Sequence, residues 1–146
     1  MKSDAEYLQA AIDLSRRCEP CSGSYSVGAV VVTSDGREFG GHTHETGAHN
    51  HAEEEAISKA LTAGVSLSGA AMYSSMEPCS TRASKPVSCS ELLIRHGFGK
   101  VVYALGEPPL FVECSGEGDL RAAGMEVIVL DEFAEQAREV NRHLLK

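Results

Sequence analysis

Strand-like and helix-like segments alternate along the second half of this chain, and this alternation constrains its fold more than any other feature. Segments 70–75, 100–105 and 126–130 have the short apolar patterns of strands, and a segment with helical features separates each from the next. Strands joined through helices run parallel in one sheet, with helices packed on its faces. The sequence therefore predicts an α/β fold whose chemistry gathers at the carboxyl ends of these strands.

The first third of the chain predicts a helix followed by a hairpin. Ser3 and Glu6 form a capping-box pattern ahead of apolar positions at helical spacing, so we expect a helix over 3–17. A β-branched run at 27–33 ends in a Ser-Asp-Gly turn signal, which predicts a hairpin with residues 37–43.

Further helices complete a three-layer arrangement. Asn50 is a candidate cap for a helix that begins near His51 and ends at Gly64. The remaining helices are expected at 88–96, 118–123 and 131–145. Together the elements predict one domain, residues 1–146, with a five-stranded mixed sheet flanked by helices.

The acidic composition of the chain argues against some classes of binding partner. The chain of 146 residues carries 13 Lys and Arg against 21 Asp and Glu, a net charge of −8. Nucleic-acid binding depends on clustered Lys and Arg, so this balance argues against it. We find neither an apolar run of membrane-spanning length nor an apolar signal core at the N-terminus. We therefore expect a cytoplasmic protein that acts on a small molecule.

Three residues form the pattern of a catalytic zinc site. His51 lies at the start of a predicted helix, Cys79 follows a predicted strand after Pro78, and Cys89 opens the next helix. One His and two Cys are three zinc ligands, and they leave the fourth position of the ion to water. Bound zinc lowers the pKa of water to about 7, which supplies hydroxide at neutral pH. The alternatives are a buried His with core thiols, or a structural site with His49 as fourth ligand.

Glu53 is the candidate proton carrier beside that site. Residues two apart do not share a helix face, but His51 and Glu53 can reach one point off the exposed end of the first turn. There Glu53 can move a proton without binding the metal. The alternative is a solvated acid within the run Glu53-Glu54-Glu55, stabilised by the helix dipole.

The chain resembles the cytidine deaminase superfamily and, within it, the pyrimidine deaminase domain of riboflavin biosynthesis. Nine residues separate Cys79 from Cys89, whereas nucleobase, nucleoside and tRNA deaminases generally keep two. The other motifs that carry the resemblance are Val27-Gly28-Ala29-Val30, His44, His51-Ala52-Glu53, Met76-Glu77-Pro78-Cys79-Ser80 and Ala137-Arg138-Glu139-Val140-Asn141.

This resemblance implies a fold, a cofactor and a reaction. It implies the cytidine deaminase fold, one Zn²⁺ per chain, a homo-oligomer, and hydrolytic release of ammonia from a heterocyclic amine. The favoured substrate is the diamino-ribosylaminopyrimidinone phosphate of riboflavin synthesis. Main-chain groups around Ser75–Glu77 are expected to hold the amine. The predicted substrate-binding residues are His44, Ser24, Tyr25, Arg82 and Met76.

Departures from the riboflavin pattern leave alternatives open. Ser24-Tyr25 stand where the family has Asn-Pro. The alternative functions are therefore deamination of another small heterocycle and service as a zinc-binding scaffold without turnover. Tyr25 has the alternative of covering the first helix, Arg82 that of a solvated loop charge, and His44 that of a surface histidine. Cys18 and Cys21 form a C-x-x-C whose expected role is that of ordinary thiols.

Overall fold

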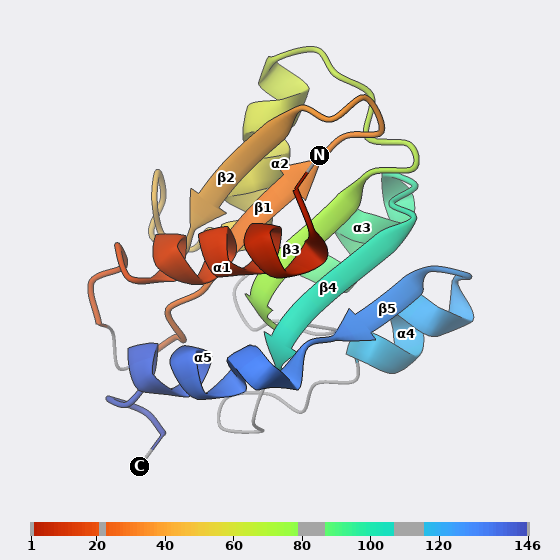
Figure 1. Ribbon diagram of the computed structural model, residues 1–146. Helices are drawn as coiled ribbons and strands as arrows, with labels where there is room; N and C mark the ends of the chain where they lie inside the picture. The colour runs from red at the N-terminus through yellow and green to blue at the C-terminus, as the bar shows by residue number, and fades with distance from the viewer. Residues whose placement is uncertain (1, 21–22, 79–86, 107–115, 146) are drawn as a thin grey trace.

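One mixed sheet organises the computed structural model, which describes residues 2–20, 23–78, 87–106 and 116–145. Its strand order is β2-β1-β3-β4-β5, with β3, β4 and β5 parallel and β1 antiparallel to both of its neighbours (Figure 1). The predicted strands and their parallel arrangement are confirmed. The strands are β1 Gly28–Val32, β2 Glu38–His42, β3 Ala71–Met76, β4 Lys100–Leu105 and β5 Glu126–Val129.

Helices cover both faces of this sheet, as the three-layer prediction expects (Figure 1). One layer holds α1 and α5, and the other holds α2, α3 and α4. Alternate residues of β1 supply the two cores: Val31 faces the α2 layer and Val30 faces the α1 layer. The helices are α1 Asp4–Ser15, α2 Ala52–Thr62, α3 Cys89–Arg95, α4 Gly116–Ala122 and α5 Ala134–Val140.

The helix starts confirm one predicted cap and correct another. Ser3 Oγ accepts from Glu6 N at 3.2 Å and Ser3 N donates to Glu6 Oε1 at 3.2 Å, so the capping box is present. For α2, however, the capping residue is His51 rather than Asn50. Its backbone N–H donates to Glu54 Oε1 at 2.9 Å, which stabilises the first turn from within.

The C-terminal helix is shorter than the predicted 131–145. A 3₁₀ turn, Asp131–Phe133, leads into α5, which ends at Val140. The physical reason is Asn141, whose side chain donates to Ala137 O at 3.0 Å and also bonds groups outside the helix. Such side-chain bonds to the backbone compete with the helical pattern and favour helix ends.

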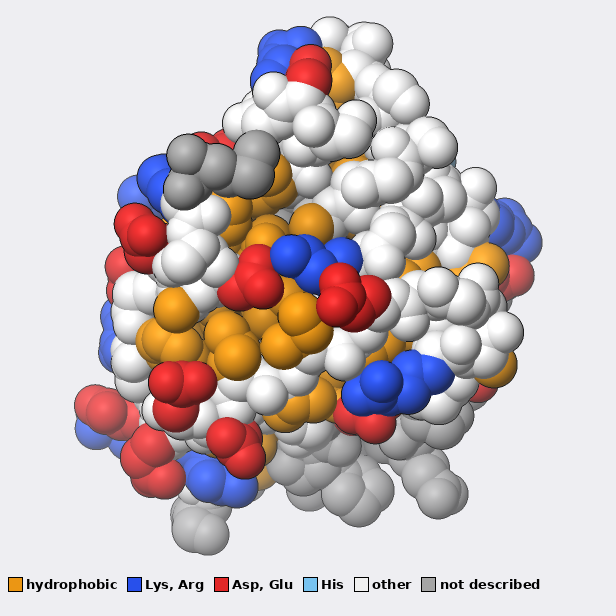
Figure 2. Space-filling model, turned by 45° about the vertical axis from the view of Figure 1, so that its right-hand side comes forward, with side chains coloured by type: hydrophobic (Ala, Val, Ile, Leu, Met, Phe, Trp, Pro, Cys, Tyr) orange, Lys and Arg blue, Asp and Glu red, His pale blue; other side chains and the backbone are white. Residues whose placement is uncertain are grey.

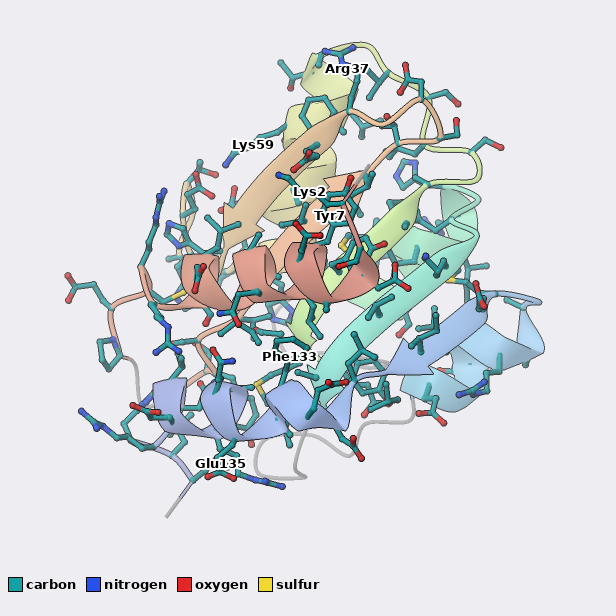
Figure 3. All side chains as sticks on the ribbon, in the orientation of Figure 1. Lys2, Tyr7, Arg37, Lys59, Phe133 and Glu135 are labelled. Atoms are coloured by element: carbon teal, nitrogen blue, oxygen red, sulfur yellow. The ribbon has the colours of Figure 1, made fainter. Side chains whose placement is uncertain are left out.

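Lys59 of α2 protects the outer edge of the sheet at β2 (Figure 3). Its Nζ donates to Gly40 O at 2.5 Å and to Glu45 Oε2 at 2.7 Å. An unpaired carbonyl on an edge strand invites pairing with another chain, and a Lys placed on it blocks that pairing.

Apolar side chains gather in the middle of the face drawn in Figure 2, with acidic and basic side chains on and around them. Within the described residues, no helix is long and apolar enough to span a membrane.

Gly28 sets how closely α1 approaches the sheet, and we expect Gly28→Ala to lower the free energy of unfolding severely. A Cβ at this position would lie 1.8 Å from Ala11 O and 2.6 Å from Ser15 N, so backbone must move. Overpacking of this kind costs about 1–3 kcal/mol or more. In the matched control Gly118→Ala, the new Cβ meets no atom within 4 Å among the described residues, and helix propensity gains up to about 1 kcal/mol. Urea unfolding measures both, and equal effects would contradict the packing argument.

Candidate active site

His51 and Cys89 meet at the edge of the sheet where β3 and β4 end. Cys89 Sγ lies 3.4 Å from His51 Nδ1, although 38 residues separate them in sequence. The contact arises because His51 caps α2 and Cys89 is the first residue of α3, and both helices begin at this edge. Cys89 is fully buried and His51 is partly buried. The fold thus brings two of the three predicted metal ligands into contact.

The separation of this pair fits a shared zinc ion. Zn–S and Zn–N bonds of about 2.3 and 2.05 Å at a tetrahedral angle place the two donor atoms about 3.6 Å apart. The observed 3.4 Å lies within about 0.2 Å of that value. Cys79, the third predicted ligand, lies outside the described residues. Among the residues that the structure does describe, no group of three or more His, Cys, Asp or Glu gathers into a metal site.

The three consecutive glutamates of α2 have distinct environments. Glu53 is only 3% exposed, which excludes the alternative of a solvated surface acid. Glu54 accepts the His51 N–H. Glu55 accepts from Thr46 N at 2.7 Å and from Thr46 Oγ1 at 2.6 Å. A buried carboxylate is uncommon without a partner or a functional role, and Glu53 shares its first turn with His51.

His44 lies on the loop that Glu55 holds against α2. Its backbone has φ 59°, a left-handed conformation that is rare outside glycine, and its N–H donates to Asn50 O at 2.9 Å. Its Nε2 lies 3.5 Å from Ser24 Oγ. Burial, and then the neighbouring His51 and His49, hold the pKa of His44 below its ordinary value. The structure therefore brings two predicted substrate-binding residues, His44 and Ser24, together beside the loop that leads to His51.

Two other predicted substrate-binding residues, Tyr25 and Met76, have side chains buried in the core. Tyr25 is 5% exposed and packs in the core with α1, a position that favours its alternative role of covering that helix. Met76 is 1% exposed in the same core at the end of β3. Of the main-chain groups around Ser75–Glu77 that are expected to hold the amine, the Glu77 N–H is engaged within the fold and donates to Leu105 O at 2.9 Å. Arg82 lies outside the described residues.

Ser90 and Gly116 are neighbours of the site that sequence reasoning missed. Ser90 Oγ donates to Pro78 O at 3.2 Å, and this buried bond joins the residue before Cys79 to the residue after Cys89. Gly116 packs against the same carbonyl, since a Cβ there would lie 2.1 Å from Pro78 O. Ser90 is an unremarkable helix-start serine in the sequence, so only its small size beside Cys89 could have drawn attention to it.

We expect Ser90→Ala to weaken zinc binding. The hydroxyl holds the chain on both sides of the predicted cysteine ligands, and loss of such outer contacts typically costs about 10–100-fold in metal affinity. Ser74→Ala is the matched control, because Ser74 Oγ is buried without a hydrogen-bond partner among the described residues. Competition with a chelating dye measures zinc affinity in both variants. Equal affinities would show that Ser90 does not support the ligands.

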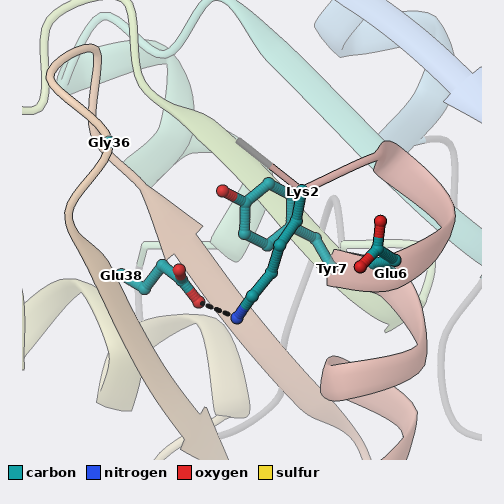
Figure 4. Close-up of a pocket in the computed structure, with 5 residues that line it drawn as sticks. All are labelled: Lys2, Glu6, Tyr7, Gly36 and Glu38. Atoms are coloured by element: carbon teal, nitrogen blue, oxygen red, sulfur yellow. Dashed lines mark hydrogen bonds and ion pairs between the residues drawn. The ribbon is translucent and has the colours of Figure 1, made fainter.

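The cleft drawn in Figure 4 is separate from this site. Lys2, Glu6, Tyr7, Gly36 and Glu38 line a space of about 570 Å³, across which Lys2 Nζ pairs with Glu38 Oε1 at 3.1 Å. Gly36 belongs to the β1–β2 turn, and the carboxyl end of β1 pairs with the amino end of β3. The cleft therefore lies at the amino end of β3, whereas the His51–Cys89 pair lies at the carboxyl end of that strand.

Cys18 has the environment of an ordinary thiol. Its Sγ lies 3.6 Å from Val27 O and 3.8 Å from His42 Nδ1, and burial raises its pKa. A thiol with a raised pKa is a poor metal ligand and a poor nucleophile. Cys21, its partner in the C-x-x-C pattern, lies outside the described residues.

Comparison with known proteins decides the family. Residues 1–105 match the model of the cytidine and deoxycytidylate deaminase zinc-binding region. The chain belongs to this zinc-binding deaminase family. The superfamily resemblance seen in the sequence is thereby confirmed, and the family's zinc-binding character agrees with the donor chemistry of His51 and Cys89.

The curated relatives to which this chain is similar include proteins of riboflavin biosynthesis. The chain is 42% identical over 125 residues to the diaminohydroxyphosphoribosylamino-pyrimidine deaminase of Schizosaccharomyces pombe, covering 84% of this chain and 31% of that protein. It is 34% identical over 139 residues to the riboflavin biosynthesis protein RibD of Aquifex aeolicus, covering 94% and 37%. The chain thus spans about a third of the length of these relatives.

Solved structures of the family share the fold. Aspergillus oryzae Rib2 deaminase superposes with a TM-score of 0.83 at 26% identity, covering 94% of this chain and 90% of that one. Acinetobacter baumannii RibD gives a TM-score of 0.82 at 30% identity, covering 98% and 39%. These neighbours confirm the predicted cytidine deaminase-like α/β fold.

Proposed function

We propose that this chain is a zinc-dependent hydrolytic deaminase. The observation that carries the proposal is the 3.4 Å contact of His51 with Cys89, beside the buried Glu53 on the same helical turn. His51, Cys89 and Cys79 would hold one zinc ion per chain. When bound, that ion supplies a Lewis acid and a water of pKa about 7.

Glu53 carries the proton transfers in this proposal. It accepts a proton from the water that attacks the ring carbon and delivers it to the adjacent ring nitrogen. It then takes the second proton from the hydroxyl now bonded to the ring carbon and delivers it to the departing amine, so that water and an amino heterocycle become a carbonyl compound and ammonia. Its burial keeps bulk water away from the shuttle, which suits a group that must return each proton to the substrate.

The proposed substrate is the diamino-ribosylaminopyrimidinone phosphate of riboflavin synthesis. Two facts support it: the names of the curated relatives, and the structure of Aspergillus oryzae Rib2 deaminase in complex with DARIPP, which is 27% identical with a TM-score of 0.82. Ser24 and His44 stand together as the proposed contacts on one side of the substrate, and Arg82 is proposed to meet its phosphate. The resemblance further implies a homo-oligomeric, cytoplasmic enzyme, and size measurement in solution tests the oligomeric state.

Ammonia release tests this function. Zinc-loaded protein is incubated with the riboflavin intermediate and, in parallel, with cytidine and guanine. We expect release from the intermediate alone. Release from another heterocycle would change the proposed substrate and keep the proposed reaction. Ser24 stands where the family has Asn, and this substitution favours deamination of another heterocycle over a zinc-binding scaffold without turnover. No release from any compound by protein with one zinc per chain would contradict the deaminase proposal.

A further inference from the structure

Asn141 is a fully buried polar residue that the proposed chemistry does not use. It follows the last residue of α5, closes the motif Ala137–Asn141, and is 0% exposed. A buried amide requires partners for its oxygen and its two N–H groups. Those partners connect α5 to segments that reach the candidate site.

The Asn141 side chain pairs with both backbone groups of Ser26. Its Oδ1 accepts from Ser26 N at 2.6 Å, and its Nδ2 donates to Ser26 O at 3.0 Å. The amide thus binds this segment as a neighbouring strand would. Nδ2 also donates to Ala137 O at 3.0 Å and lies 3.6 Å from Met76 Sδ.

Ser26 in turn sets the position of Ser24 and its neighbours. Ser24 precedes it by two residues and contacts His44 Nε2 at 3.5 Å. The next residue, Val27, forms two hydrogen bonds with Thr43, which lies beside His44. Val27 N donates to Thr43 Oγ1 at 2.9 Å, and Val27 O accepts from Thr43 N at 3.0 Å. Fixing the Ser26 backbone therefore fixes the Ser24–His44 pair.

We infer that Asn141 is a positioning residue for substrate binding, acting through Ser26 on the Ser24–His44 pair. The inference rests on the proposed function of this site. Glu53, His51 and Cys89 belong to the opposite helical layer, so the proton transfers and the metal ligands do not depend on Asn141. Its loss should weaken substrate binding more than turnover.

The test measures KM, kcat, zinc content and the exchange of the Ser26 amide hydrogen. Asn141→Ala removes every bond to Ser26. Asn141→Asp keeps the acceptor for Ser26 N but loses the donor to Ser26 O, and it carries the test at nearly constant volume if the alanine variant fails to fold. Leu67→Ala is the control, because this buried side chain lies just before β3, at the strand end opposite Met76.

We expect both Asn141 variants to raise KM by about tenfold or more, with kcat within about threefold and zinc content unchanged. Exchange at Ser26 should accelerate in Asn141→Ala, which removes the acceptor of the Ser26 N–H, and not in Leu67→Ala, even at equal melting temperature. A KM equal to that of Leu67→Ala in either Asn141 variant, or unchanged exchange at Ser26 in Asn141→Ala, overturns the inference. Failure of the wild-type chain to turn over the riboflavin intermediate instead contradicts the proposed function, so the two failures are distinguishable.

Discussion

Glu53→Gln should abolish ammonia release while leaving zinc bound. Gln has the size of Glu and fills the same buried position, but it cannot accept the proton of the attacking water. General acid–base groups contribute about 10²–10⁴-fold to rate, and Glu53 is proposed for two successive transfers, so we expect a loss at or beyond the upper end. Ammonia release gives the rate, and atomic emission gives the zinc content.

Glu54→Gln is the matched control for that variant. Glu54 stands next in the chain and accepts the His51 N–H at 2.9 Å, a bond that the Gln side-chain oxygen can also accept. This variant should retain most of the wild-type rate. An unchanged rate in Glu53→Gln, or equal losses in both variants, would remove Glu53 from the mechanism.

Cys89→Ala should lose zinc, and with it activity. Cys89 is the only proposed ligand whose contact with His51 lies within the described residues, so its removal leaves at most two protein ligands for the ion. Outer-shell changes already cost about 10–100-fold in affinity, and loss of a direct ligand should cost more. Competition with a chelating dye measures the dissociation constant directly.

Cys18→Ala tests whether that loss is specific to the site. Cys18 is a half-buried thiol with a raised pKa, in contact with His42 rather than His51. We expect its removal to leave zinc affinity within about threefold of wild type. If Cys18→Ala weakened zinc binding as much as Cys89→Ala, the ligand set proposed here would be wrong.

The sequence was sufficient for the parts of this structure that depend on local pattern. The Ser3–Glu6 box, the hairpin after β1 and the alternation of β3, β4 and β5 with helices all follow from short-range spacing. The contact of His51 with Cys89 also followed, because parallel strands place successive helix starts at one edge.

Long-range side-chain contacts escaped that reasoning. Asn141 ends α5 early because it bonds Ser26, 115 residues away, and no local signal predicts such a partner. Tyr25 is a second example. It follows Ser24 in the sequence and was predicted to bind substrate, but its side chain is buried in the core that α1 covers. His51 replaced Asn50 as the α2 cap, since boundaries shift by a residue wherever two neighbours can serve.

The Ser90–Pro78 bond also bears on how specificity can change in such a chain. This bond holds Pro78, just before Cys79, against Ser90, just after Cys89. The positions of Pro78 and Ser90 therefore do not depend on the length or composition of the stretch between the two cysteines. Closing a loop of twice the length costs only about 0.6 kcal/mol in chain entropy. Segments inserted between Pro78 and Ser90 would therefore change the surface beside the candidate site and leave the His51–Cys89 contact in place, which makes this stretch a suitable target for library selection of new binding properties.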